Sequence, residues 1–84
     1  MSMSSSLELY HNKGEQDAVN RVYDPPHALG TARSEKQFEE NGAYDQGYFH
    51  TLGQIHQGDG HYDPPTDLGA KEAYDEGWKA AENS

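Results

Sequence analysis

YDPPHALG at residues 23–30 returns as YDPPTDLG at residues 62–69, so that six of eight positions are identical within a chain of 84 residues. The first proline of each copy has a fixed φ and disfavours the helical conformation in the aspartate before it, and neither proline can donate a backbone hydrogen bond. A helix therefore cannot run through either copy. We expect each copy to form a short extended segment, here called a YDPP arm, and we expect its leucine, Leu29 or Leu68, to enter the core.

The two YDPP arms divide the chain into three pieces, and each piece carries a related helical phrase. Each phrase has a ring three residues before a glycine and a small residue four positions after that glycine. The phrases cover residues 11–18, 44–51 and 74–81, and the last two share Ala-Tyr-Asp-x-Gly-aromatic. The third phrase has the clearest helical period, because its small and aromatic residues recur at three- and four-residue spacings. The sequence therefore predicts three helices.

Local signals indicate where the second and third helices begin and end. Ser34 with Gln37 has the spacing of a capping box, and Thr66 or Asp67 can cap the third helix. The run Gly-Asp-Gly at residues 58–60 is expected to end the second helix. These signals favour a middle helix that is longer than its two neighbours.

Each helical phrase places a glycine in the middle of its helix, at Gly14, Gly47 and Gly77. An internal glycine destabilises a helix by about 1 kcal/mol relative to alanine. Three such costs in one register indicate that another backbone or an aromatic ring approaches each glycine closely. We therefore predict that each YDPP arm returns the chain so that one glycine-aromatic face meets another.

These observations predict an all-α fold, a small bundle of three short helices joined by extended YDPP arms. We expect a single helical domain over residues 7–84, preceded by a disordered tail over residues 1–6. Leu, Ile, Val and Phe together number only ten, so the core is thin and must depend on the six tyrosines and one tryptophan.

The charge of the chain bears on its partners. Fifteen acidic residues against six lysines and arginines give a net charge of −9, without a basic stripe. Such a chain repels phosphate backbones, so we expect a protein partner with a basic surface and no direct binding to nucleic acid. No apolar run is long enough to cross a membrane, which predicts a cytoplasmic protein without membrane association. The chain has no cysteine, so it has neither disulfides nor thiolate metal sites.

The stretch from Ala43 to Ala81 resembles ribosome modulation factor and its small bacterial and phage relatives. In that family an aromatic-glycine helix, a Pro-Tyr turn and a helix of the form W-x-x-G-W-x-x-A follow one another. The residues that carry the resemblance are Ala43, Tyr44, Gly47, Tyr48, Thr51, Tyr62, Asp63, Pro64, Ala73, Tyr74, Gly77, Trp78 and Ala81. The repeated His-Asn-x-Gly and Tyr-Asp-Pro-Pro phrases also look like an uncharacterised family of small bacterial proteins. The resemblance implies a two-helix layout. The family's basic RNA contacts do not carry over to this acidic chain.

The aromatic residues are the candidate binding residues, and two interpretations of them remain open. They form the core, since little else is available, or some of them form an exposed patch, because tyrosine and tryptophan are common anchors of protein interfaces. Phe49 is the strongest interface candidate, because it falls off the apolar stripe of its helix. We predict a partner-binding set of Tyr48, Phe49, Asp75 and Trp78.

We predict no catalytic, cofactor-binding or metal-binding residues. His56 and His61 flank a glycine-rich turn with Asp59, but ordinary exposed imidazoles are the simpler interpretation. The Gly-Asp-Gly run lacks the other carboxylates of a calcium loop. The carboxylate pairs at 39–40 and 75–76 read as solvated helix faces, and nothing suggests an enclosed pocket. We therefore do not expect an enzyme.

Three hypotheses for function follow. The first is a non-catalytic, acidic protein-binding module that modulates or inhibits a larger partner, such as a nucleic-acid-handling protein. The second follows the resemblance and is a ribosome-associated dormancy factor. The third is a self-assembling structural protein that forms homo-oligomers, which the thin core and the internal repeat favour.

Overall fold

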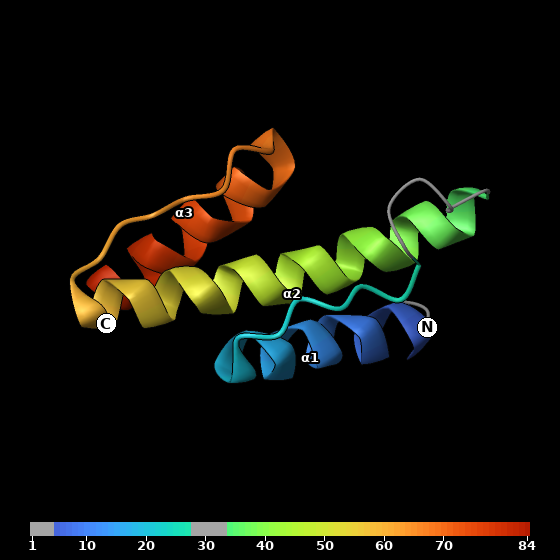
Figure 1. The fold of residues 1–84 in the computed structure, drawn as a ribbon, viewed down its shortest axis with the longest axis horizontal. Helices are drawn as coiled ribbons and strands as arrows, with labels where there is room; N and C mark the ends of the chain where they lie inside the picture. The colour runs from blue at the N-terminus through green and yellow to red at the C-terminus, as the bar shows by residue number, and fades with distance from the viewer. Residues whose placement is uncertain (1–4, 28–33) are drawn as a thin grey trace.

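A computed structural model describes residues 5–27 and 34–84, with side chains described from residue 7 onward in the first helix. Three helices follow one another: α1 over Ser5–Asn20, α2 over Glu35–Asp59 and α3 over Leu68–Glu82 (Figure 1). The described residues contain no strand, so the predicted all-α class is confirmed. Of the tail predicted over residues 1–6, residues 1–4 lie outside the described residues, and residues 5 and 6 belong to α1. No helix in this described part of the chain has both the length and the apolar character to cross a membrane.

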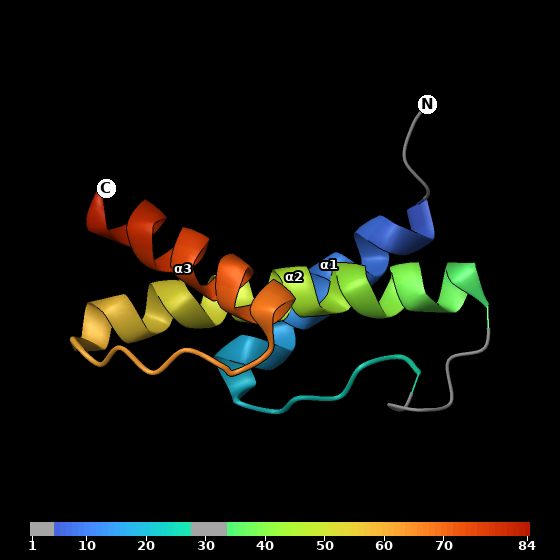
Figure 2. The same cartoon turned by 90° about the horizontal axis from the view of Figure 1, so that it is seen from above.

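The longest helix, α2, is central, and α1 and α3 lie on different sides of it (Figures 1 and 2). Among the described residues, α1 and α3 each pack on α2 and do not pack on each other. The three helices therefore do not enclose one common core, as the predicted bundle would. They form two helix hairpins that share α2.

The second YDPP arm and the part of the first that is described lack regular secondary structure over residues 22–25 and 61–65. Both run back along the same side of α2, which is the lower edge of the molecule in Figure 2. Leu68 is 79% exposed, so the leucine of the second arm does not enter the core as expected, and Leu29 lies outside the described residues. The tyrosines of the arms hold them to the helices instead.

The predicted caps of α2 and α3 are present. The Ser34 hydroxyl accepts a hydrogen bond from the Gln37 N–H at 3.2 Å at the start of α2. The Asp67 carboxylate accepts one from the Ala70 N–H at 3.1 Å at the start of α3. Gly60, with a φ of 71°, ends α2 in the left-handed conformation that favours glycine.

Helix α1 ends in the same type of turn as α2, although the residue in the left-handed conformation is Arg21, with a φ of 61°. The N–H of Val22 donates to the carbonyl of Asp17 at 2.9 Å, just as the N–H of His61 donates to the carbonyl of His56 at 2.9 Å. This pattern satisfies carbonyls that a helix end otherwise leaves without partners. The two helix ends therefore direct the two YDPP arms in the same way.

Glycines set the close contact between α1 and α2. A Cβ atom on Gly14 would overlap the main-chain carbonyl oxygen of Tyr44, and a Cβ atom on Gly47 would overlap that of His11. The contact is reciprocal, with one glycine from each helix. Because glycine has hydrogen in place of Cβ, each Cα–H can point at the opposite carbonyl in the manner of a weak hydrogen bond. The predicted close approach is therefore that of a backbone.

The contact between α2 and α3 has the same geometry. A Cβ atom on Gly53 would overlap the carbonyl oxygen of Tyr74, and a Cβ atom on Gly77 would overlap that of His50. Both hairpins thus pair a His-x-x-Gly segment with a Tyr-x-x-Gly-aromatic segment. Gly53 therefore has the role in the second hairpin that Gly14 has in the first. The sequence pattern grouped Gly14 with Gly47 and Gly77, and this grouping does not match the packing.

Candidate protein-binding site

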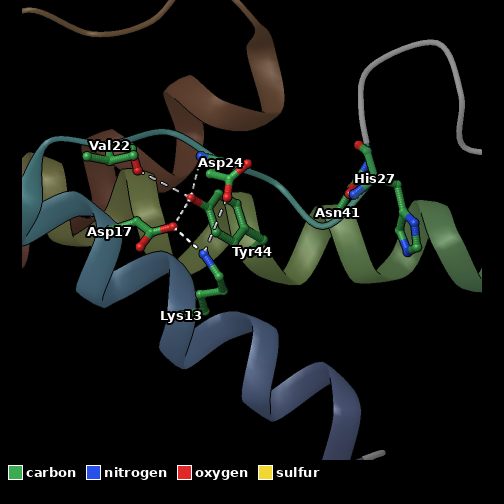
Figure 3. Close-up of polar contacts among 7 residues, drawn as sticks. All are labelled: Lys13, Asp17, Val22, Asp24, His27, Asn41 and Tyr44. Carbon is green, nitrogen blue, oxygen red and sulfur yellow. Dashed lines mark hydrogen bonds and ion pairs between the residues drawn. The ribbon is translucent and has the colours of Figure 1, made fainter.

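The fully buried Tyr44 joins α1 to the first YDPP arm (Figure 3). Its hydroxyl donates to Asp17 Oδ2 at 2.5 Å and accepts the N–H of Asp24 at 2.7 Å, and the Val22 carbonyl oxygen lies 3.4 Å away. Lys13 Nζ donates to the same Asp17 oxygen at 2.8 Å. The hydrogen bond from Lys13 lowers the pKa of the Asp17 carboxyl most, and the hydrogen bond from Tyr44 lowers it further.

The fully buried Tyr74 plays the same part in the second hairpin. Its hydroxyl accepts the N–H of Asp63 at 2.8 Å and lies 2.5 Å from His56 Nδ1, with the His61 carbonyl oxygen 3.4 Å away. Burial lowers the pKa of His56, as do the nearby His61 and Arg21, which favours the neutral imidazole beside the Tyr74 hydroxyl. An imidazole therefore takes the place that a carboxylate takes in the first hairpin.

The tyrosine of each YDPP arm covers the buried tyrosine of its hairpin. The Tyr23 hydroxyl donates to Asp45 Oδ1 at 2.6 Å, and the Tyr62 hydroxyl donates to Asp75 Oδ1 at 2.6 Å. Each of these rings also lies edge-on to the buried tyrosine of its hairpin, with centroids 5.7 Å apart in both cases. Asp45 and Asp75 therefore occupy equivalent positions in the two hairpins. The residues around these two aspartates differ.

Lysines neutralise Asp75. Lys71, one turn earlier on α3, donates to its Oδ2 at 2.7 Å. The hydrogen bonds from Lys71 and Tyr62 lower the pKa of the Asp75 carboxyl, and the charge of Lys79 lowers it further. In the second hairpin the aspartate is thus already paired with a cation of its own chain.

Asp45 has neither of these lysines. The residue equivalent to Lys71 is Asn41, whose amide oxygen accepts the main-chain N–H of His27 at 3.0 Å and whose amide nitrogen donates to the His27 carbonyl at 2.8 Å (Figure 3). The residue equivalent to Lys79 is Phe49. Within residues 5–27 and 34–84, no lysine or arginine forms an ion pair with Asp45.

A groove of about 270 Å³ lies beside Asp45, where the two hairpins meet. We call it the Phe49 groove, and it is lined by Tyr23, Asp45, Phe49, Pro65, Thr66, Asp67 and Ala70. The Tyr23 and Phe49 rings are in contact there, with centroids 5.7 Å apart. The groove therefore combines apolar walls with two carboxylates.

The two carboxylates of the Phe49 groove each keep one oxygen without a hydrogen-bond partner among the described residues. The Tyr23 hydroxyl occupies Asp45 Oδ1, and the Ala70 N–H occupies Asp67 Oδ2. Burial raises the pKa of the Asp45 carboxyl, the hydrogen bond from Tyr23 lowers it, and the negative charge of Asp67 raises it again. Among the described residues the groove thus has no positively charged side chain, and a cation placed in it would relieve the repulsion between the carboxylates.

The residues of the predicted partner-binding set lie in two places. Phe49 lines the groove and packs on Tyr48 with ring centroids 5.0 Å apart. Tyr48 is only 8% exposed, so its ring is mostly buried beside Phe49 and offers little surface to a partner. Trp78 and Asp75 lie on α3, where Trp78 packs edge-on against the tyrosine of the second arm. No ring contact joins Phe49 to Trp78 in the described part of the chain.

The partner-binding set predicted from sequence did not include Asp45, Tyr23 or Asp67. A signal for Asp45 was available, because Tyr-Asp-x-Gly occurs at residues 44–47 and 74–77, and only the second copy has a lysine four residues before its aspartate. Tyr23 and Asp67 reach the groove from the two arms. Their proximity depends on how the hairpins are arranged, which the local sequence does not specify.

Comparisons of the chain with models of protein families, with curated proteins and with solved structures find no match. The candidate site therefore rests on the chain's own geometry.

Proposed function

We propose that the protein is a non-catalytic, acidic module of the cytoplasm that binds a protein with a basic surface and modulates or inhibits that partner. The observation that carries this proposal is the Phe49 groove, where aromatic walls and two carboxylates meet without a cation among the described residues. Aromatic side chains supply contact area at protein interfaces, and a net charge of −9 steers the module toward positive surfaces.

Phe49 is the proposed centre of the interface, and Tyr48 supports it. Trp78 and Asp75 form a second contact area on α3, where both contact Tyr62 of the second arm. Because both YDPP arms run along the same side of α2 (Figure 2), we expect one flat partner surface to reach both areas. Interfaces of this kind typically draw most of their binding energy from a few aromatic residues.

A pull-down from native lysate tests the proposal, with and without nuclease and with three forms of the protein. Phe38 provides the matched control, because it is also a phenylalanine of α2, is 63% exposed and does not line the groove. We expect wild type and Phe38→Ala to capture the same one or two proteins in both conditions, and Phe49→Ala to lose them. Capture of ribosomal proteins that nuclease abolishes would favour the ribosome-associated alternative. Capture of the chain's own copies alone would favour self-assembly.

A further inference from the structure

Building on the proposed protein-binding function, we propose that the Phe49 groove receives one arginine side chain of the partner protein. Its guanidinium would take, beside Asp45, the place that Lys71 takes beside Asp75.

The internal repeat is the first argument for this occupant. Asp45 and Asp75 occupy equivalent positions, and each accepts a hydrogen bond from the tyrosine of its arm at 2.6 Å. The remaining oxygen of Asp75 accepts a hydrogen bond from Lys71. The remaining oxygen of Asp45 has no such donor among the described residues, because Asn41 replaces the lysine and binds the backbone of the first arm instead. In the described part of the chain, Asp75 thus has a cation beside it, and the equivalent Asp45 has none.

The chemistry of the walls selects arginine over lysine. Phe49 stands where the second hairpin has Lys79, and its ring and that of Tyr23 meet at a centroid distance of 5.7 Å. A guanidinium group is planar and weakly hydrated, stacks on aromatic rings, and pairs with carboxylates through several N–H donors. An ammonium group is strongly hydrated and binds as a point charge. A groove lined by aromatic rings and by two carboxylates suits the guanidinium.

The dimensions of the groove favour a side chain over a free metabolite. Its volume of about 270 Å³ is smaller than that of most pockets that enclose small ligands, which usually occupy roughly 300–1,000 Å³. Asp45 lies on α2 and binds Tyr23 of the first arm, whereas Asp67 belongs to the second arm and caps α3. A cation that contacts both would therefore link the two arms.

A substitution at position 41 can supply the missing cation from within the chain. In Asn41→Lys, the new lysine precedes Asp45 by four residues on α2, the spacing at which Lys71 reaches Asp75. This variant also loses the hydrogen bonds between Asn41 and His27. Asn41→Ala loses the same hydrogen bonds without adding a charge, and is the matched control. Any difference between the two variants therefore reports the lysine.

The probe is the peptide acetyl-Gly-Arg-Gly-amide, titrated into the isotope-labelled full chain while amide NMR shifts are followed. We expect saturable shifts at Phe49 and Thr66, weaker binding as salt is raised, and little effect from the citrulline peptide, which lacks the charge. Binding to Asn41→Lys should be about tenfold weaker than to Asn41→Ala. Asp45→Asn should weaken binding similarly. Asp59→Asn, which removes one charge at the far end of α2, should leave binding unchanged.

Three results would overturn the inference: no saturable shift at the groove, equal affinity for Asn41→Lys and Asn41→Ala, or a lysine peptide that binds at least as tightly as the arginine peptide. The pull-down separates this failure from that of the proposed function. Suppose that a partner is lost with Phe49→Ala but binds Asn41→Lys and Asn41→Ala equally. The proposed binding function would then stand, and the proposal that an arginine of the partner enters the groove would be wrong. If the pull-down yields no partner whose capture depends on Phe49, the proposed function itself would be wrong, even if the arginine peptide binds.

Discussion

The carbonyl oxygen of Tyr74 on α3 lies where a side chain on Gly53 of α2 would have to begin. The same relationship occurs between Tyr44 and Gly14 in the first hairpin. Both helix pairs in this short chain therefore depend on the absence of Cβ atoms at equivalent positions. This close packing brings the buried tyrosines within reach of the YDPP arms.

Gly53→Ala should destabilise the protein, because the new methyl group would meet backbone atoms that cannot move aside. We expect a loss of about 2 to 3 kcal/mol in the free energy of unfolding, measured by urea denaturation. Gly42→Ala is the control on the same helix, since a Cβ atom there would have no neighbour from another element within 4 Å among the described residues. That variant should be more stable than wild type by about 1 kcal/mol, because alanine favours the helix. Equal effects of the two substitutions would contradict the proposed role of Gly53.

Tyr44→Phe should cost about 1 to 3 kcal/mol, because it leaves the Asp24 N–H and the Asp17 carboxylate short of a hydrogen-bond partner. Tyr10→Phe is the matched control, since no hydrogen bond of the Tyr10 hydroxyl is found in the described part of the chain. Thermal unfolding followed by circular dichroism compares the two. A Tyr44→Phe protein as stable as Tyr10→Phe would show that the hydroxyl does not hold the arm.

His56 should make the stability of the second hairpin depend on pH. Burial lowers its pKa in the folded protein below the usual 6.5, and His61 and Arg21 act in the same direction, against Asp63 and Asp59. The unfolded chain therefore binds the proton more readily than the folded chain. Stability is complete above pH 6.5 and falls as the pH drops from there through the folded pKa.

Urea denaturation between pH 7.5 and pH 5 tests this dependence. We expect the loss of stability over this range to be smaller in His56→Asn, which retains a side chain able to accept the Tyr74 hydroxyl hydrogen. An identical pH dependence in wild type and variant would contradict the role assigned to His56.

Asp17 should contribute a second, more acidic dependence. The hydrogen bonds from Lys13 and Tyr44 lower its pKa in the folded protein below the usual 3.8. Its contribution to stability is therefore present above that pH and is lost as the pH falls through the folded pKa. Asp17→Asn should be less stable than wild type at pH 7, and the difference should shrink toward pH 2 in the same denaturation assay. A constant difference across this range would show that the carboxylate charge is not involved.

The local features of the fold could be predicted from the sequence, because each depends on neighbouring residues. The prolines of the YDPP arms exclude helix, and Ser34, Asp67 and Gly60 act on the backbone within one turn. Gly53 escaped the prediction, since the residue four positions later is Gln57, whereas the rule derived from the other glycines required a small residue there. The arrangement of hairpins around α2 depends on contacts between distant segments, and no local pattern specifies them.

Of the residues that line the groove, only Phe49 belongs to the partner-binding set predicted from the sequence, because it left the apolar stripe of its helix. Asp45 was also distinguishable from Asp75, since only Asp75 has a lysine four residues before it, and the structure shows that this Lys71 pairs with it. Thr66 and Asp67 were the two residues expected to cap the third helix, and the structure shows that Asp67 does so. The position of Asp67 beside Asp45 depends on the path of the second arm, which brings these two carboxylates to the same groove.

The most direct test of the central claim, that the protein binds a partner through the Phe49 groove, is photo-crosslinking in living cells. A benzophenone amino acid would replace Thr66, an exposed residue on the rim of the groove, or the distant and exposed Phe38. We predict a discrete protein adduct from position 66 and none from position 38. Adducts from neither position, or the same adducts from both, would contradict the claim.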